Sequence, residues 1–272
     1  MLPEACHAPA AKEEKRMLNA LIGIARTAGK MMLDYQNAAI HQKEGHYNFV
    51  TDADVAVQEY IQGALSALRP DAAFIGEEQD NARLTDAPAF IVDPIDGTLN
   101  FMRCRHMSAV SIGYLEGKQP LLGVIYNPYL DEMYTAERGK GARCNHRAIH
   151  VSETPLENAM IALGTSPYDQ ELVKKTLRAA QEFLLRAGDL RRTGSAAIDL
   201  CDVACGRIDA FYELRLRPWD VAAGALLVSE AGGVFCSLGH DAPYFEDACG
   251  IVASNRRCAE EALRIVQEAA KC

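Results

Sequence analysis

The chain has 272 residues, of which 49% are hydrophobic and 24% are charged. This composition fits one large domain or two closely packed halves, and it excludes a wholly disordered chain. The formal net charge of -9 argues against a nucleic-acid partner, which favours a basic surface, but it is compatible with an anionic small substrate held through metal cations.

The first half of the chain predicts two helices, two strands and a series of hairpins. After a loose tail of about ten residues, an apolar face predicts a helix over 11–36. Thr51 or Asp52 can cap a second helix that runs to Leu68. Short apolar runs predict strands at 73–75 and 89–92, and turn residues predict an antiparallel meander over 107–151.

The second half predicts strands and helices in alternation. This change of pattern predicts that the chain divides into an N-terminal half, 1–155, and a C-terminal half, 156–272. The expected strands are 160–163, 190–192 and 208–212, and the expected helices are 170–187, 195–205, 219–231 and 257–270.

Cysteine usage and the N-terminus both favour a cytoplasmic protein with reduced thiols. The chain contains nine cysteines, an odd number, and it begins without an apolar leader segment. Its apolar stretches are too short to span a bilayer, so no membrane partner is expected. Cys201 and Cys205 are one helical turn apart, as are His146 and His150 if that region is helical. Neither pair has a matching second pair, so core or surface residues are favoured over a zinc site.

Acidic residues lie at the ends of several predicted elements. Asp93 and Asp96 follow a buried strand and precede Gly97 and Thr98, while Glu77 follows the other strand and Asp220 begins a helix. Taken alone, the Asp93–Thr98 segment is equally well explained by a turn with Asp96 capping a helix, whereas Glu77 and Asp220, taken singly, are better explained as a cap or a surface charge. Carboxylates grouped in one place suit a hard cation such as Mg²⁺. Whether these side chains meet in space is not fixed by their spacing.

Four blocks of sequence resemble the inositol monophosphatase family over about residues 12–270. They are Gly76-Glu77-Glu78, the run from Asp93 to Phe101, the run from Trp219 to Gly224, and Ser229 to Gly233. The resemblance implies an α+β fold layered as an α-β-α-β-α sandwich and a homodimer. It also implies a phosphatase with two to three Mg²⁺ ions per active site and sensitivity to lithium.

The resemblance also implies roles for individual residues. The metal ligands would be Glu77, Asp93, the Ile95 carbonyl, Asp96 and Asp220. Thr98, Asp54 and Glu77 would be catalytic, with Thr98 and Asp54 orienting the attacking water. The substrate contacts would be Gly97, Thr98, Thr165, Gly194, Ser195, Ala196 and Glu213. Lys43 would be a loop contact, with a solvated surface lysine as the alternative.

The expected substrate is a small phosphorylated alcohol, with myo-inositol monophosphate as the leading example. Glu213 can accept polyol hydroxyls and would repel a second phosphate, whereas four arginines could bind a second phosphate or a carboxylate, or could be paired structurally. These arginines are Arg191, Arg192, Arg215 and Arg217. The alternatives are fructose-1,6-bisphosphatase, histidinol-phosphatase or 3'-phosphoadenosine-5'-phosphate phosphatase on the same scaffold. A regulatory relative without catalysis is a third interpretation, which the complete acidic set argues against.

Overall fold

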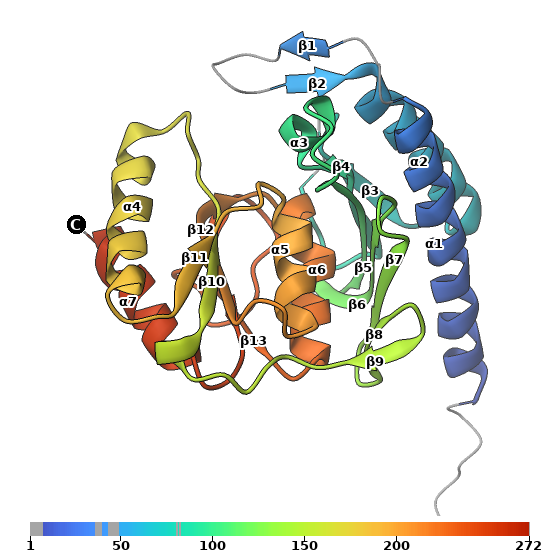
Figure 1. Cartoon of the computed structure of the whole chain (residues 1–272). Coiled ribbons are helices and arrows are strands. Elements are labelled where there is room, and N and C mark those ends of the chain that lie inside the picture. The colour runs from blue at the N-terminus through green and yellow to red at the C-terminus, as the bar shows by residue number, and fades with distance from the viewer. Residues whose placement is uncertain (1–7, 36–39, 43–48, 80, 82, 272) are drawn as a thin grey trace, which may run out of the picture.

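A computed structural model describes residues 8–35, 40–42, 49–79, 81 and 83–271 (Figure 1). Within them, the elements follow in the order α1 (Ala8–Asp34), β1 (Ile40–Gln42), β2 (Phe49–Thr51), α2 (Asp52–Leu68), β3 (Ala73–Gly76), β4 (Ala89–Asp96), α3 (Thr98–Met102), β5 (Ala109–Glu116), β6 (Gln119–Asn127), β7 (Glu132–Glu137), β8 (Gly141–Cys144), β9 (Arg147–Ile149), a 3₁₀ turn (Leu156–Asn158), β10 (Met160–Leu163), α4 (Gln170–Leu184), β11 (Asp189–Arg191), α5 (Ala196–Ala204), β12 (Ala210–Leu216), α6 (Pro218–Glu230), β13 (Val234–Ser237), β14 (Cys249–Ser254) and α7 (Ala259–Lys271).

The first sheet has the strand order β3-β4-β5-β6-β7-β8-β9. β3 and β4 are parallel, and the pairs from β4 to β9 are antiparallel. The predicted meander over 107–151 is therefore confirmed. Helices α1 and α2 cover one face, where Leu21 and Ile61 share a buried apolar core with Phe90 and Ile112.

Helices α5 and α6 lie between the first sheet and a second one. Ile91 and Ile125 of the first sheet share a buried core with Leu200 of α5, Val221 of α6 and Phe211 of β12. The second sheet has the order β11-β10-β12-β14-β13. Figure 1 shows the resulting succession of helix pair, sheet, helix pair, sheet and helix pair, which confirms the expected α+β sandwich.

Helices α4 and α7 complete the outer layer. Phe183 of α4 and Ile265 of α7 pack with Tyr212 and Val252 of the second sheet in a third buried core. Among the described residues, no helix combines the length and apolarity needed to cross a membrane.

Several local expectations need correction. The first helix begins at Ala8, within the expected ten-residue tail. His146 and His150 are not one helical turn apart, because His146 lies in the turn between β8 and β9 with φ 69° and His150 follows β9. Strands β13 and β14 were not predicted. β4 also continues to Asp96, beyond the expected end at Val92.

Candidate active site

A bulge at the end of β4 places two aspartates on one face of the first sheet. Asp93 pairs with Ser111 of β5, whereas Asp96 pairs with Ala109, so β4 contains one extra residue between these pairs. Without that residue, positions three apart would face opposite sides of a strand. Ile95 accordingly joins the core beneath α1 and α2. Asp93 and Asp96 both face α6, and Pro94 falls within the bulge, where the loss of a ladder donor is tolerated.

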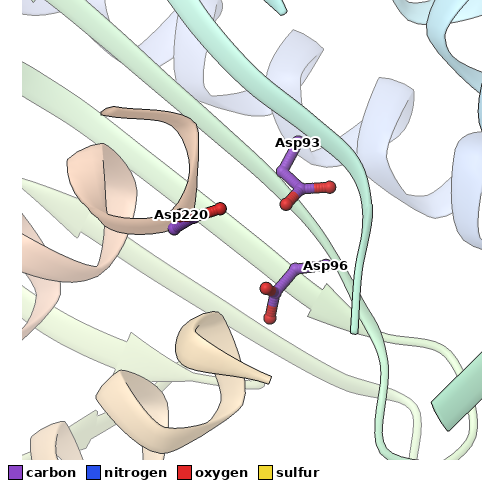
Figure 2. A group of neighbouring side chains, drawn as sticks. All are labelled: Asp93, Asp96 and Asp220. Carbon is purple, nitrogen blue, oxygen red and sulfur yellow. The ribbon is translucent and has the colours of Figure 1, made fainter. Parts of the chain in front are cut away.

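Asp220, in the first turn of α6, completes a group of three carboxylates. One oxygen of each of Asp93, Asp96 and Asp220 lies within 4.8 Å of the others. Figure 2 shows the three side chains around a common space between β4 and the start of α6. Asp220 is held there by its own helix, since its Oδ2 accepts a hydrogen bond of 2.6 Å from the Arg217 N–H. This group is the one potential metal cluster found among the described side chains.

Burial raises the pKa of all three carboxyls, and repulsion by neighbouring carboxylates adds to the shift for Asp93 and Asp220. Asp93 is 1% exposed and Asp96 is 7% exposed. Burial, reinforced by neighbouring carboxylates, raises the pKa of Asp93 and the pKa of Asp220 well above the usual range. Burial also raises the pKa of Asp96 to about 6, opposed by hydrogen bonds from Ser195 and Ala197. A hard divalent cation would relieve this repulsion, and a set made entirely of oxygen donors fits such an ion.

Thr98 and Asp54 lie beside the acidic group. Thr98 Oγ1 is 3.4 Å from Asp54 Oδ1 and 3.3 Å from the Ile95 carbonyl oxygen. Asp54 is fixed by the N-terminus of α2, where Thr51 donates to its Oδ2 from the backbone N–H at 2.7 Å and from Oγ1 at 2.5 Å. The predicted cap Thr51 is thus the N-cap, and its capping box also orients the expected catalytic carboxylate.

Glu77 lies at the edge of this group. It follows β3, is half-buried, and its negative charge contributes to the raised pKa of Asp93 and of Asp220. Its carboxylate is not among the three that lie within 4.8 Å of one another. Of the expected ligands, Asp93, Asp96 and Asp220 therefore lie together, and the Glu77 charge acts on Asp93 and Asp220 from the edge of this group.

Gly97 is required by its backbone and by its surroundings. Its φ is +83°, and a Cβ there would lie 3.0 Å from the Met107 carbonyl oxygen and 3.1 Å from Ser195 Cβ. The left-handed conformation and the close approach both favour glycine. Gly97 thus brings the end of β4 against the loop before α5.

A cavity of about 190 Å³ joins the acidic group to most of the expected substrate contacts. Its lining comprises Asp96, Gly164, Thr165, Tyr168, Arg192, Gly194, Ser195, Ala196, Asp199, Glu213, Arg215, Leu216 and Asp220. Gly97 and Thr98 lie outside this lining, next to Asp96 in the chain. Lys43 lies outside the described residues.

Ser195 connects this cavity to the acidic group. It is the N-cap of α5, where its Oγ accepts from the Ile198 N–H at 3.2 Å, and it donates to Asp96 Oδ2. The Ala197 N–H donates to the same oxygen at 2.9 Å. The start of α5 therefore positions Asp96 by direct hydrogen bonds.

Glu213 brings a further carboxyl to the cavity. Its Oε2 lies so close to Gly164 that any Cβ at that position would overlap it. Burial and the charge of Asp96 raise the pKa of Glu213 to about 8, while Arg192 acts in the opposite direction. Glycine at 164 thus makes room for Glu213.

Two polar residues of the site were missed by the sequence analysis. Asp199 is 1% exposed and lines the cavity, where its Oδ2 accepts from Thr193 Oγ1 at 2.8 Å. The one feature of the sequence that could have indicated Asp199 is the presence of an acidic residue inside the apolar helix segment from Ala196 to Ala204. Asn100 donates to the Met107 carbonyl at 2.8 Å and to the Thr193 carbonyl at 3.0 Å, which joins the two halves of the chain.

The arginines and cysteines have mostly structural surroundings. Arg191, Arg215 and Arg217 form ion pairs with Asp189, Asp169 and Asp247, respectively. Cys201 is buried within α5, and burial raises the pKa of the Cys201 thiol and the pKa of the Cys205 thiol.

The whole chain also matches known proteins. The model of the inositol monophosphatase family matches residues 13–271. The Nus factor SuhB of Xylella fastidiosa is 36% identical over 265 residues, covering 93% of this chain and 95% of that protein. Inositol monophosphatase 2 of Solanum lycopersicum is 41% identical over 231 residues, covering 81% and 86%, respectively.

A solved structure gives the same result for the fold. The extragenic suppressor protein suhB from Bartonella henselae superimposes with a TM-score of 0.85 at 34% identity, covering 93% of this chain and 99% of that one. The residues matched by the family model, 13–271, include both sheets and the three converging aspartates. The chain therefore belongs to the inositol monophosphatase family.

Proposed function

We propose that this chain is a Mg²⁺-dependent phosphatase that hydrolyses a phosphate monoester of a small polyol, with myo-inositol monophosphate as the leading substrate. The observation that carries this proposal is the geometry of one cavity. Its lining combines Asp96 and Asp220, two of three converging carboxylates, with hydroxyl, backbone and carboxyl groups suited to a polyol. Family membership supports the same class of reaction.

The acidic residues would hold two to three Mg²⁺ ions. Asp93, Asp96, Asp220 and Glu77 would be the carboxylate ligands, and Ile95 would contribute its carbonyl oxygen. When bound, divalent ions supply a water of lowered pKa and stabilise charge that develops on the phosphoryl group and leaving oxygen. Mg²⁺ is the proposed metal because the donors are all oxygen atoms.

The residues around the ligands would orient water and substrate. Thr98 and Asp54 would hold the attacking water by hydrogen bonds, with Glu77 nearby as a further acceptor. The water oxygen attacks phosphorus, the ester P–O bond breaks, and the alcohol leaves after taking up a proton. Gly97 and Thr98 would contact the phosphate, while Thr165, Gly194, Ser195, Ala196 and Glu213 would contact the alcohol.

The test is phosphate release by the purified chain with and without Mg²⁺. The panel includes myo-inositol 1-phosphate, histidinol phosphate, fructose 1,6-bisphosphate and 3'-phosphoadenosine 5'-phosphate, each assayed with and without lithium. We expect Mg²⁺-dependent turnover of myo-inositol 1-phosphate that is reduced by lithium, which competes for a Mg²⁺ position. Asp93→Asn and Asp220→Asn should each abolish turnover with the fold retained by circular dichroism. Near-wild-type hydrolysis by either variant would refute the ligand assignment.

A regulatory role is the second candidate. Relatives named Nus factor SuhB cover almost the whole chain at similar identity to the plant enzymes. The acidic set favours catalysis, because a protein that acts by binding alone does not need three converging carboxylates with a fourth beside them. If the purified chain with Mg²⁺ released phosphate from none of the panel, the regulatory role would be preferred. The homodimer is a further part of the proposal, and light scattering of the purified chain tests it.

A further inference from the structure

The cavity that would take the alcohol part of the substrate has an acidic interior and a basic rim. Asp96 and Asp199 are buried in its lining, whereas Arg192 and Arg215 are exposed. The acidic carboxylates therefore lie at the inner end and the guanidinium groups lie where the cavity meets solvent. A bound alcohol would extend from the carboxylates at the inner end toward the guanidinium groups at the rim.

Arg192 is placed to contact a ligand. Its Nε donates to Thr165 Oγ1 at 3.2 Å, which holds the guanidinium group over the cavity. A Cβ on Gly194 would lie 3.5 Å from Arg192 Nη1, so this nitrogen lies close to the loop expected to contact the alcohol. In the part of the chain that the structure describes, no ion pair within 4.0 Å is found for Arg192. A guanidinium group has five N–H donors, and one bond to Thr165 leaves the others for a ligand.

Arg215 lies on the same rim and is held from outside the cavity. Its Nη1 is 3.1 Å from Asp169 Oδ2, and Asp169 Oδ1 caps α4 through the Glu171 and Leu172 N–H groups. This arrangement fixes the position of Arg215 and uses one side of its guanidinium group. Two guanidinium groups on one small cavity suit a planar or tetrahedral oxyanion better than a neutral hydroxyl.

We propose that Arg192 and Arg215 bind an acidic group at the end of the substrate opposite the phosphate that is cleaved. This inference rests on the proposed phosphatase function and narrows its substrate class. Glu213, which also lines the cavity, still favours hydroxyl groups, since its carboxyl can accept hydrogen bonds from them. The substrate that satisfies both features is a polyhydroxylated chain with a phosphate ester at one end and a carboxylate or second phosphate at the other.

The test compares substrates that differ in one substituent. Glucitol 6-phosphate and gluconate 6-phosphate share a six-carbon polyol frame, but the second has a carboxylate where the first has a primary alcohol. Glucitol 1,6-bisphosphate replaces the carboxylate with a phosphate. With Mg²⁺, we expect kcat/KM of the wild-type chain to be about tenfold higher for an acidic substrate than for glucitol 6-phosphate, as for charge-assisted hydrogen bonds. The acidic substrate with the larger gain identifies the oxyanion.

Arg192→Gln removes the charge and keeps a polar side chain of similar reach. We expect it to lower kcat/KM for the acidic substrate about tenfold, mainly through KM because the rim does not touch the reacting atoms, and to change glucitol 6-phosphate less than about twofold. Arg215→Gln should act in the same direction. Arg191→Gln is the matched control, because Arg191 is the adjacent exposed arginine, pairs with Asp189 and lies outside the cavity lining.

Three outcomes separate the inference from the proposed function. Turnover of all three substrates without preference for an acidic one would overturn the inference and leave the phosphatase assignment intact. So would equal losses on the neutral and acidic substrates in Arg192→Gln. Absence of Mg²⁺-dependent turnover on every substrate, myo-inositol 1-phosphate included, would overturn the proposed function itself.

Discussion

At the scale of single residues, the acidic group lowers the stability of the folded chain when no metal is bound. Asp93 and Asp96 are almost fully buried, and they share a space less than 5 Å across with Asp220. The pKa of each is raised, so the folded chain binds their protons more tightly than the unfolded chain does. As pH rises above the ordinary carboxyl range, the folded state loses stability relative to the unfolded state until the carboxyls ionise.

Metal binding should reverse that loss. At pH 7.5 we expect saturating Mg²⁺ to stabilise the wild-type chain, because the ions bind the folded carboxylates and not the unfolded chain. At about 100-fold excess over Kd the gain is ~2.7 kcal/mol, which corresponds to a rise in Tm of about 5–10 °C for a chain of this size. Differential scanning fluorimetry in Mg²⁺ and in EDTA measures the difference.

Asp93→Asn should raise the melting temperature in EDTA and reduce the stabilisation that Mg²⁺ gives. In EDTA at pH 7.5 the variant should melt at a higher temperature than the wild-type chain, because it lacks a buried carboxyl whose pKa is raised by its surroundings. Near pH 3, below the ordinary pKa of aspartate, the wild-type carboxyl is mostly protonated in both states, so this advantage should largely disappear. In Mg²⁺ the variant should gain much less than the wild-type chain. A full Mg²⁺ response in Asp93→Asn would remove Asp93 from the ligand set.

Most residues proposed for this site could be named from the sequence, but the way in which their side chains come together in space could not. Asp93 to Thr98, Glu77 and Asp220 were found by motif and order. The bulge that turns Asp96 to the same face as Asp93 has no local signal beyond Pro94, because it is defined by pairing with β5. Asn100 was missed for a related reason, because it donates to the Thr193 carbonyl, which is 93 residues away in the chain. Asp199 accepts from Thr193, only six residues away, but no motif marks that pair.

At the scale of elements, α6 connects the site to the core. Its first turn holds Asp220, and its remaining turns lie between the two sheets beside α5. Gly224 allows that approach, since a Cβ there would lie 2.8 Å from Leu200 Cβ and closer still to Leu200 Cδ1. The position of Asp220 relative to β4 therefore depends on tight packing between α5 and α6.

Gly224→Ala should therefore destabilise the chain, although alanine is the better helix former. We expect a loss of ~1–3 kcal/mol in the free energy of unfolding from overpacking against Leu200, with reduced Mg²⁺ affinity as α6 shifts. Gly63→Ala is the matched control, because Gly63 lies in α2 and a Cβ added there would have nothing within 4 Å. That variant should gain about 0.4–1 kcal/mol. Chemical denaturation measures both, and equal effects of the two substitutions would contradict the role of the α5–α6 contact.

Elements whose signals are local were predicted better than those defined by distant pairing. The N-cap of α2 at Thr51 and the β5–β9 meander follow from capping and turn residues close in the chain. The second sheet has the order β11-β10-β12-β14-β13, in which the neighbours from β11 to β14 are separated in the chain by at least one helix. β13 and β14 are consecutive in the chain, but residues 238–248 form a long connection, so there was no hairpin signal between them.

At the scale of the whole molecule, the two sheets share one buried core, in addition to the core that each forms with its outer helices. One buried core contains Ile91 and Ile125 from the first sheet together with Phe211 and Ile251 from the second, with α5 and α6 between them. The division at residue 155 stays a prediction about chain organisation. Because the middle helices pack against both sheets, unfolding of one half would expose apolar surface of the other, and the two halves should unfold together.

Trp219 gives a direct measurement of that cooperativity. It is the single tryptophan of the chain, and it packs against the core shared by the two sheets. In guanidinium chloride and EDTA, its fluorescence should follow the same transition as far-UV circular dichroism, which reports on all helices and strands. Ile91→Ala in the first sheet should cost ~2–5 kcal/mol and move both transitions equally, although Trp219 belongs to the other half of the chain. Transitions that separate, or a Trp219 midpoint that ignores Ile91→Ala, would show that the halves unfold independently and that the shared core does not couple them.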